Sequence, residues 1–314
     1  MTKGWISRKA PVGLGIRLAI GVLLLSCSAA MAQSPSAVVP EGMAKQVSPH
    51  VWEIKSFPNI AIVVGDRATL VVDTGLGARN GATIARETRK LSKGTRLYLT
   101  TTHFHPEHAS GDEGFPADTV LIRNAAQQKE LEQHGAQFIE LFRSRSPEFK
   151  ELLAGQESRK PDIVFDREAR IDLGGVTARL LWLGAAHTVG DELTFVEEDG
   201  TLITGDVVQN KVSPGIATDD SSVKSWIAVV DQLPALNAKL IVPDHSDPGD
   251  AATLIAQERA FLGDLETLTL TAKREGKSAD DAAAAVAAEM KTKYADWSSL
   301  TGVPNMAKRA YAEK

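Results

Sequence analysis

The segment THFHPEHASGDEG (residues 102–114) holds three of the chain's seven histidines and one glutamate within six consecutive positions. His103 and His105 are two positions apart, so on an extended segment both side chains point to the same side. Glu107 continues this alternation, and a proline fixes the local turn before His108. Neutral imidazole and carboxylate are the ligands that zinc takes where thiolate is absent. The segment therefore predicts a metal site.

Three further candidate ligands each follow a segment with strand character. GAAHTVGD carries His187, LITGD ends at Asp206, and VPDHSDP carries His245. A scaffold can bring side chains at several strand ends to one point, so we expect these three to join the first cluster. The two remaining histidines, His50 and His134, stand alone and are interpreted as surface or hydrogen-bonding residues.

The first 32 residues differ in composition from the rest of the chain. Four basic residues precede the apolar run LAIGVLLL (residues 18–25), and small residues lead to A-M-A at 30–32. These are the parts of a secretory signal peptide, and the apolar run is too short for a comfortable bilayer span. We therefore expect residues 1–32 to be cleaved and the mature protein to be periplasmic or secreted. Lipid anchoring through Cys27 is an alternative that the competing cleavage site disfavours.

Composition limits the classes of function. The chain has 314 residues, of which 43% are hydrophobic and 24% charged, as in globular proteins with a sizeable core. Its single cysteine lies in the leader, so the mature chain has no disulfide and no thiolate ligand or nucleophile. The net charge is −5, and loss of the basic leader makes the mature chain more acidic. This composition argues against nucleic acid as a partner, because phosphate binding requires clustered Lys and Arg. A small-molecule substrate is expected instead.

Strand and helix patterns alternate along the chain. Short β-branched segments bounded by turn residues predict strands at 50–56, 59–65, 69–75, 96–105, 168–173, 176–184, 192–199, 200–206 and 238–245. Helical spacing marks residues 78–94, 125–145, 147–155, 222–236 and most of 251–314. This order favours two sheets packed face to face with helices outside. We expect one domain over residues 33–250 and a C-terminal helical extension, 251–314, packed on the same domain. Whether that extension also forms a homodimer contact is left open.

Five motifs now give a family resemblance. HFHPEH resembles the HxHxDH signature of the metallo-β-lactamase superfamily. VVDTG (71–75), GAAHTVGD, TGD (204–206) and VPDHSDP resemble the other motifs of that superfamily, in the same order. The resemblance implies an αββα sandwich, in which two mixed β-sheets are flanked by helices. It also implies a centre of one or two metal ions at one edge of the sandwich.

The resemblance also implies a role for each candidate ligand. The first metal would be held by His103, His105 and His187. The second would be held by Glu107, His108 and His245, with Asp206 bridging the two. Zinc is the expected metal, with iron as the alternative.

The sequence departs from the family pattern at three positions. Glu107 replaces the usual aspartate, so its carboxylate lies one methylene further from the backbone. This difference exceeds the tolerance of metal–ligand distances unless the loop shifts. The second site is therefore expected to be weak, shifted or empty. Asp244 and Ser246 replace the glycines that flank the last histidine. Asp244 is a candidate hydrogen-bond acceptor for a ligand histidine, because ligating imidazoles commonly donate their other N–H to a carboxylate.

The expected activity is metal-dependent hydrolysis, in which a metal-activated water attacks a carbonyl group. Glu107 and Asp206 are the candidate catalytic residues that orient the water. The bond is left open among β-lactam, lactone, and thioester or ester, and the substrate pocket is expected near residues 125–155 and 209–218. Two alternatives remain: a single-iron redox enzyme resembling persulfide dioxygenases, and a metal-binding protein with impaired catalysis.

Overall fold

The computed structural model describes residues 1, 37–213, 215–216 and 221–313. The expected signal peptide, including Cys27, lies outside the described residues except for Met1. The chain divides into two units, residues 1–34 and 35–314, and the fold described below is that of the second unit.

Two mixed sheets form the centre of this unit. The first runs in the order β1-β2-β3-β4-β5-β6-β7, antiparallel as far as β4 and parallel beyond it. Its strands are β1 Lys45–Ser48, β2 Val51–Ile54, β3 Ile60–Val64, β4 Ala68–Val72, β5 Arg96–Thr100, β6 Val120–Asn124 and β7 Ile163–Phe165. The second runs in the order β13-β12-β11-β10-β9-β8, with only β11 and β12 parallel. Its strands are β8 Glu168–Asp172, β9 Thr177–Leu181, β10 Leu193–Val196, β11 Thr201–Gly205, β12 Leu240–Pro243 and β13 Gly249–Asp250.

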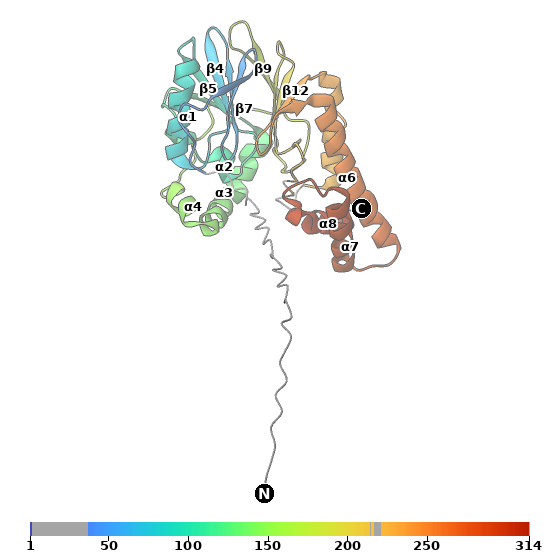
Figure 1. The fold of residues 1–314 in the computed structure, drawn as a ribbon. Coiled ribbons are helices and arrows are strands. Elements are labelled where there is room, and N and C mark those ends of the chain that lie inside the picture. The colour runs from blue at the N-terminus through green and yellow to red at the C-terminus, as the bar shows by residue number, and fades with distance from the viewer. Residues whose placement is uncertain (2–36, 214, 217–220, 314) are drawn as a thin grey trace. The chain divides into compact units, whose positions relative to one another are not determined.

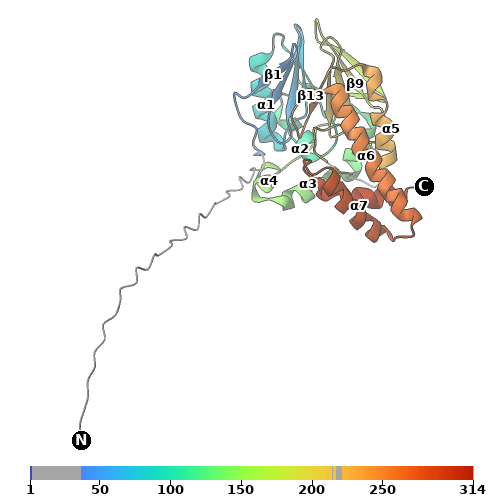
Figure 2. The ribbon, with the colours of Figure 1, turned by 45° about the vertical axis from the view of Figure 1, so that its right-hand side comes forward.

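Helices cover the outer faces of both sheets and one end of the sandwich (Figures 1 and 2). The helix α1 covers the first sheet, α5 and α6 cover the second, and α2, α3, α4 and α7 lie toward one end. The helices are α1 Gly77–Leu91, α2 Pro106–Ala109, α3 Ala125–Arg145, α4 Pro147–Leu152, α5 Val223–Val230, α6 Ala251–Arg274, α7 Ala279–Lys293 and α8 Val303–Ala312. Short 3-10 helices lie at Asp112–Gly114, Leu233–Leu236 and Leu300–Gly302. None of the helices in the described part of the chain combines the length and apolar character needed to cross a membrane.

The layers follow from strands that are apolar on both faces. Every residue of β3 is buried. Ala61 and Val63 belong to the core between the sheets, whereas Ile60 and Ile62 pack toward α1 with Ile84. A strand covered on both faces reads as a continuous apolar run rather than an alternating one. The expected αββα sandwich of two mixed sheets is confirmed.

The C-terminal helices pack on the outer face of the second sheet. Leu181 and Leu202 from this sheet share one buried cluster with Trp226 of α5 and Phe261 of α6. Met290 of α7 belongs to the same cluster, as do four residues of α8. The helices of residues 251–313 therefore complete a hydrophobic layer that the sheet and α5 begin.

Two local expectations are wrong. The strand predicted over 96–105 ends at Thr100, so His103 and His105 lie on a loop and not on an extended strand. The reason is that Pro106 begins the one-turn helix α2, for which the chain must bend beforehand. Four strands, β1, β6, β7 and β13, were not predicted at all. Two of them, β7 and β13, have only three and two residues.

Candidate metal centre

The candidate ligands lie beyond the carboxyl ends of two pairs of parallel strands. β4 and β5 lead to Asp73 and to the histidine segment, while β11 and β12 lead to Asp206 and to His245. Carboxyl ends of neighbouring parallel strands meet at the same edge, where open α/β sheets commonly place their sites. His187 joins this edge from the long connection between β9 and β10.

The segment before α2 is folded by backbone hydrogen bonds. The N–H groups of His108 and Ala109 both donate to the carbonyl of His105, at 3.0 and 2.9 Å. His105 is therefore the cap of the one-turn helix, and its imidazole lies against those of His103 and His187. A proline suits the first helical position, because the missing N–H would have no partner there.

The first group of donors consists of three buried histidines. Nε2 of His103 lies 2.9 Å from Nδ1 of His105, and Nε2 of His187 lies 3.4 Å from the same nitrogen. Burial lowers the pKa of all three rings, to about 4 for His187 and well below the usual range for the other two. The rings are therefore neutral at pH 7, which is the state in which imidazole binds a metal.

The orientation of His187 is fixed by its second nitrogen. Nδ1 lies 2.5 Å from the carbonyl oxygen of Gly215. A carbonyl only accepts, so Nδ1 must donate, and Nε2 keeps its lone pair toward the other two histidines. This is the arrangement found when a ligand imidazole is held by an outer acceptor.

The second group joins two histidines and two aspartates. One donor atom from each of its four members lies within 4.8 Å of the others; the members are His108, Asp206, Asp244 and His245. Asp206 connects both groups, since Oδ2 lies 3.1 Å from Nε2 of His187 and Oδ1 lies 3.4 Å from Nε2 of His245. Burial, followed by the facing carboxylate of Asp244, raises the pKa of Asp206 well above its usual range. Two buried carboxylates in contact fit a site made for a cation.

Glu107 lies beside the second group and not within it. Its Oε1 is 3.9 Å from Nε2 of His108. Its Oε2 and that Nε2 are buried and have no hydrogen-bond partner among the described residues. Burial raises the pKa of Glu107 to about 7. The ligand role expected for Glu107 stays a prediction, and Asp244, expected only as an outer acceptor, occupies a place among the donors.

Asp73 is a supporting residue that the sequence placed in a motif without giving it a role. Its Oδ2 lies 3.0 Å from Nδ1 of His108, and its Oδ1 accepts the N–H of Thr102 at 2.7 Å. Burial alone would lower the pKa of His108, but Asp73, Asp244 and Glu107 outweigh it and raise that pKa to about 9. Asp73 therefore accepts a hydrogen bond from Nδ1–H of His108, which leaves Nε2 directed away from Asp73.

Gln209 connects the loops after β11 and β12, a contact that sequence analysis did not reveal. Its Nε2 donates to the carbonyl of Gly205 at 2.8 Å and to a carboxylate oxygen of Asp244. Its Oε1 accepts the hydroxyl of Ser246 at 2.7 Å and the N–H of His245 at 3.3 Å. Because the side chain is fully buried, this amide fixes the two loops relative to each other.

The other two histidines lie outside both donor groups. Nδ1 of His50 lies 2.6 Å from the buried carboxylate of Asp199. His134 is on α3, where its ring faces Phe104. His50 therefore has the hydrogen-bonding character that was expected of it.

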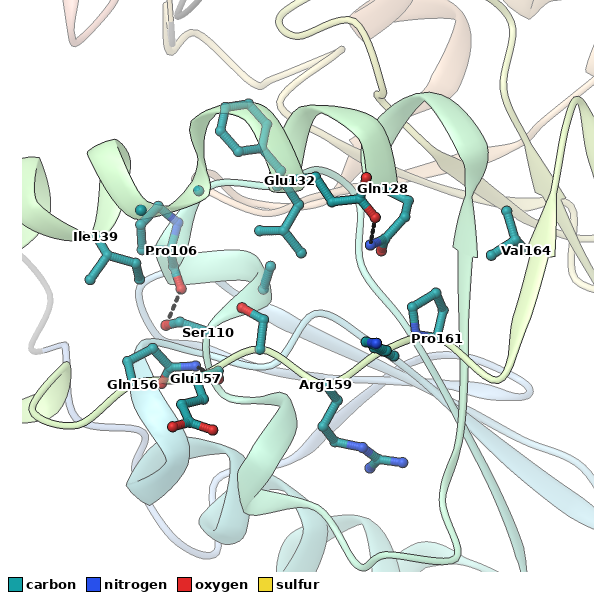
Figure 3. A pocket seen from close by; sticks show the side chains of 17 residues that line it. Pro106, Ser110, Gln128, Glu132, Ile139, Gln156, Glu157, Arg159, Pro161 and Val164 are labelled. Atoms are coloured by element: carbon teal, nitrogen blue, oxygen red, sulfur yellow. Dashed lines mark hydrogen bonds between the residues drawn. The ribbon is translucent and has the colours of Figure 1, made fainter.

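A cavity with a volume of about 640 Å³ lies between α2, α3 and residues 156–161. Figure 3 shows Pro106 and Ser110 on one side of it and Gln128 on the other. Residues of α3 line it as expected, but its lining includes no residue of 209–216 and none of the donors of either group. The cavity is thus separate from the donor groups, to which it is linked through Phe104 and Pro106, the neighbours of His105 in the chain.

Comparison with known families agrees with this arrangement. The profile of the Metallo-beta-lactamase superfamily matches residues 55–245, which include every donor of both groups. The match covers more than half of the chain. The protein belongs to the metallo-β-lactamase superfamily.

Individual relatives are more distant. A linear primary-alkylsulfatase from Pseudomonas sp. is 23% identical over 210 residues, which cover 57% of this chain and 39% of that protein. The structure of a stereoselective inverting sec-alkylsulfatase from Pseudomonas sp. matches with a TM-score of 0.68 at 14% identity, over 86% of this chain and 50% of that one. A metallo-β-lactamase from Pontibacter korlensis matches with a TM-score of 0.56 at 17% identity, over 70% and 98%. At these identities the structures share the fold alone, and this chain spans half the length or less of the two alkylsulfatases.

Proposed function

We propose that this protein is a metal-dependent hydrolase that binds one or two zinc ions. The observation that carries the proposal is the position of Asp206, whose two carboxylate oxygens face histidines of two separate donor groups. His103, His105 and His187 would hold the first ion, and His108, Asp206 and His245 would contribute to the second. A bound divalent metal lowers the pKa of a water toward 7 and polarises the bond to be broken.

The chain's own residues would orient the reactants. Asp206 faces the space between the two groups, where its carboxylate can accept a hydrogen bond from a water in line with a substrate. Glu107 carries a buried oxygen without a partner among the described residues and is the second candidate for this task. A candidate base must come within hydrogen-bond reach of the proton that it accepts, and both residues lie at the donor groups.

The substrate is proposed as a small molecule with a hydrolysable acyl or sulfate ester bond. The β-lactam, lactone and thioester or ester classes are those that the motifs favoured. The named relatives add alkyl sulfates to the panel, because one alkylsulfatase matches in sequence and another matches in fold. Export to the periplasm or beyond remains part of the proposal and rests on the leader sequence alone.

Substitution of the first donor group tests the hydrolase proposal. His103→Ala and His187→Ala are each expected to abolish metal-dependent turnover, because two imidazoles alone do not hold the first ion in place. The measurement is hydrolysis of nitrocefin, a lactone, a thioester and a linear alkyl sulfate by zinc-loaded protein. His50→Asn is the matched control, since it changes a histidine outside both groups and keeps a donor to Asp199.

Full activity in both alanine variants would refute the assignment. Metal analysis of protein purified without added metal separates the alternatives. One iron and no zinc would favour the redox enzyme, and tightly bound zinc without turnover on any substrate would favour the metal-binding protein with impaired catalysis.

A further inference from the structure

The second donor group contains an acid at a position where the superfamily pattern has a glycine. Asp244 directly precedes His245 and is only 2% exposed. Its carboxylate faces that of Asp206, which is also buried. Two carboxylates in this position repel each other unless a proton or a cation lies between them. The imidazoles of His108 and His245 on either side complete a donor set for a cation.

The two oxygens of Asp244 have different surroundings. Oδ1 accepts the amide of Gln209, which fixes the side chain. Oδ2 is buried and accepts no hydrogen bond from the described residues. It lies 3.4 Å from Nδ1 of His108, but the single proton on that nitrogen is already directed to Asp73 at 3.0 Å. Orienting His108 is therefore the task of Asp73, and Oδ2 of Asp244 faces the imidazole without accepting a hydrogen bond from the described residues.

Glu107 does not occupy the place that Asp244 fills. It lies on the first turn of α2, and its Oε1 is 3.9 Å from Nε2 of His108. Asp244 comes instead from the end of β12, beside the strand that leads to Asp206. The carboxylate that the family signature takes from the histidine segment is thus available here from a different strand.

We propose that Asp244 is a ligand of the second metal ion and takes the place of the acid at position 107. The second site is then formed by two imidazoles and two carboxylates, from His108, His245, Asp206 and Asp244. This set suits zinc and also manganese or iron, since carboxylates and imidazoles both bind these ions. The assignment rests on the proposed metal centre and adds one ligand to it.

Zinc stoichiometry tests the assignment. Wild type, Asp244→Asn and Glu107→Gln are loaded with zinc, freed of excess by gel filtration, and analysed by mass spectrometry of the metal. The expected counts are two, one and two ions per chain. Asparagine has the same shape and can still accept the Gln209 amide, so the change removes charge and one donor oxygen only. Loss of an outer acceptor costs about 10- to 100-fold in metal affinity. If Asp244→Asn keeps both zinc ions and its zinc affinity falls by no more than this factor, the assignment is contradicted.

Two further readouts do not depend on activity. The zinc-induced rise in melting temperature should be smaller for Asp244→Asn than for Glu107→Gln, because ligand binding stabilises the folded state by mass action. The absorption spectrum of cobalt-loaded Asp244→Asn should lose the contribution of one ion. If Asp244→Asn does not fold, Asp244→Ala is tested in the same way. One ion in Glu107→Gln and two in the Asp244 variants would overturn the proposal.

The outcome separates this proposal from that of the hydrolase. Two ions in the wild type without turnover on any substrate would refute the hydrolase and leave the ligand assignment intact. A single ion in the wild type that is lost in His103→Ala would refute the second site, whereas hydrolysis by that single-ion protein would leave the hydrolase intact.

Discussion

Individual residues owe their chemistry at this centre to burial. His103, His105 and His187 are all buried, and their pKa values are lowered because the charged form loses its hydration. His108 is equally buried, but the surrounding carboxylates reverse the direction. The same fold thus keeps the three imidazoles of the first group neutral and surrounds His108 with carboxylates that raise its pKa. The difference depends on the acids near each ring and not on the residue type.

Glu258 of α6 gives a pH-dependent prediction away from the metal ligands. Burial raises its pKa from 4.5 to about 8, and the N–H of Gln209 is a distant donor at 3.4 Å. The unfolded chain loses this proton above pH 4.5, whereas the folded chain keeps it until about pH 8. The unfolded state therefore binds fewer protons over this range, and the free energy of unfolding falls as the pH rises. Each pKa unit corresponds to about 1.4 kcal/mol.

Glu258→Gln removes this titration. We expect the difference in melting temperature, variant minus wild type, to increase by several degrees from pH 5 to pH 8. The measurement is thermal unfolding of metal-free protein, since metal binding has a pH dependence of its own. Glu289→Gln, at an exposed position on α7, controls for the loss of one negative charge. Parallel melting temperatures for wild type and Glu258→Gln across the range would contradict the buried-carboxyl interpretation.

At the scale of elements, the sequence predicted what depends on local pattern. β3 and α3 were predicted because an apolar run between turn residues and a long helical periodicity are local signals. β7 was missed because it has three residues, two of them exposed, and exists only through pairing with β6. The end of β5 was placed too late because β-branched threonines, which favour strands, continue from Thr100 to Thr102 into the loop.

The histidines of the donor groups were likewise predictable from local pattern, whereas the place of Asp244 was not. Histidines are few, and their positions directly after strand-like segments are enough to indicate convergence. The place of Asp244 among the donors depends on the pairing of β12 with β11 and on the buried Gln209 amide. These are contacts between distant segments, for which one sequence gives no spacing to measure. The motif therefore pointed to Glu107, whereas the tertiary structure brings Asp244 into the group.

The contact between α3 and the loop of His187 gives a prediction for one glycine. The N–H of Gly190 donates to Glu130 of α3 at 2.7 Å. A Cβ at Gly190 would lie 2.3 Å from the Cα of Gln127. This is a backbone atom, which cannot move aside at low energetic cost. Gly190→Ala should therefore push the loop from α3 and lower stability by about 1–3 kcal/mol. We also expect weaker zinc binding at His187, measured by competition with a chelator.

Gly263→Ala on α6 is the matched control. Its Cβ would meet the flexible end of the Arg259 side chain, at 2.9 Å from Nη1, and alanine favours helix over glycine. This variant should melt at or above the wild-type temperature with unchanged zinc affinity. Equal behaviour of the two variants would show that the close approach at Gly190 has no structural consequence.

On the scale of the whole molecule, the C-terminal helices contact the loops that carry the donors. Arg309 of α8 donates to the carbonyl of Ser221, and Ser221 in turn donates to the carbonyl of Ala186, next to His187. The N–H of Ser213, four residues beyond Gln209, donates to the carbonyl of Ser298 at 3.1 Å. The carboxylate of Glu313 accepts the N–H of Val223, at the first turn of α5. Residues 251–313 thus support both donor groups from outside the matched family region.

Removal of residues 251–314 tests whether residues 33–250 form an independent domain. The truncation exposes the outer face of the second sheet, because Phe261, Leu265 and Met290 cover it in the full chain. Burial of each such side chain contributes about 1.5–3 kcal/mol, and a domain is stable by only about 5–15 kcal/mol in total. We therefore expect the shortened chain to be insoluble or to lack a cooperative melting transition. The comparison is with residues 33–314, expressed in the same way and followed by circular dichroism. A soluble 33–250 chain with the same melting temperature would show that the helices are an accessory layer and that the sandwich closes its own core.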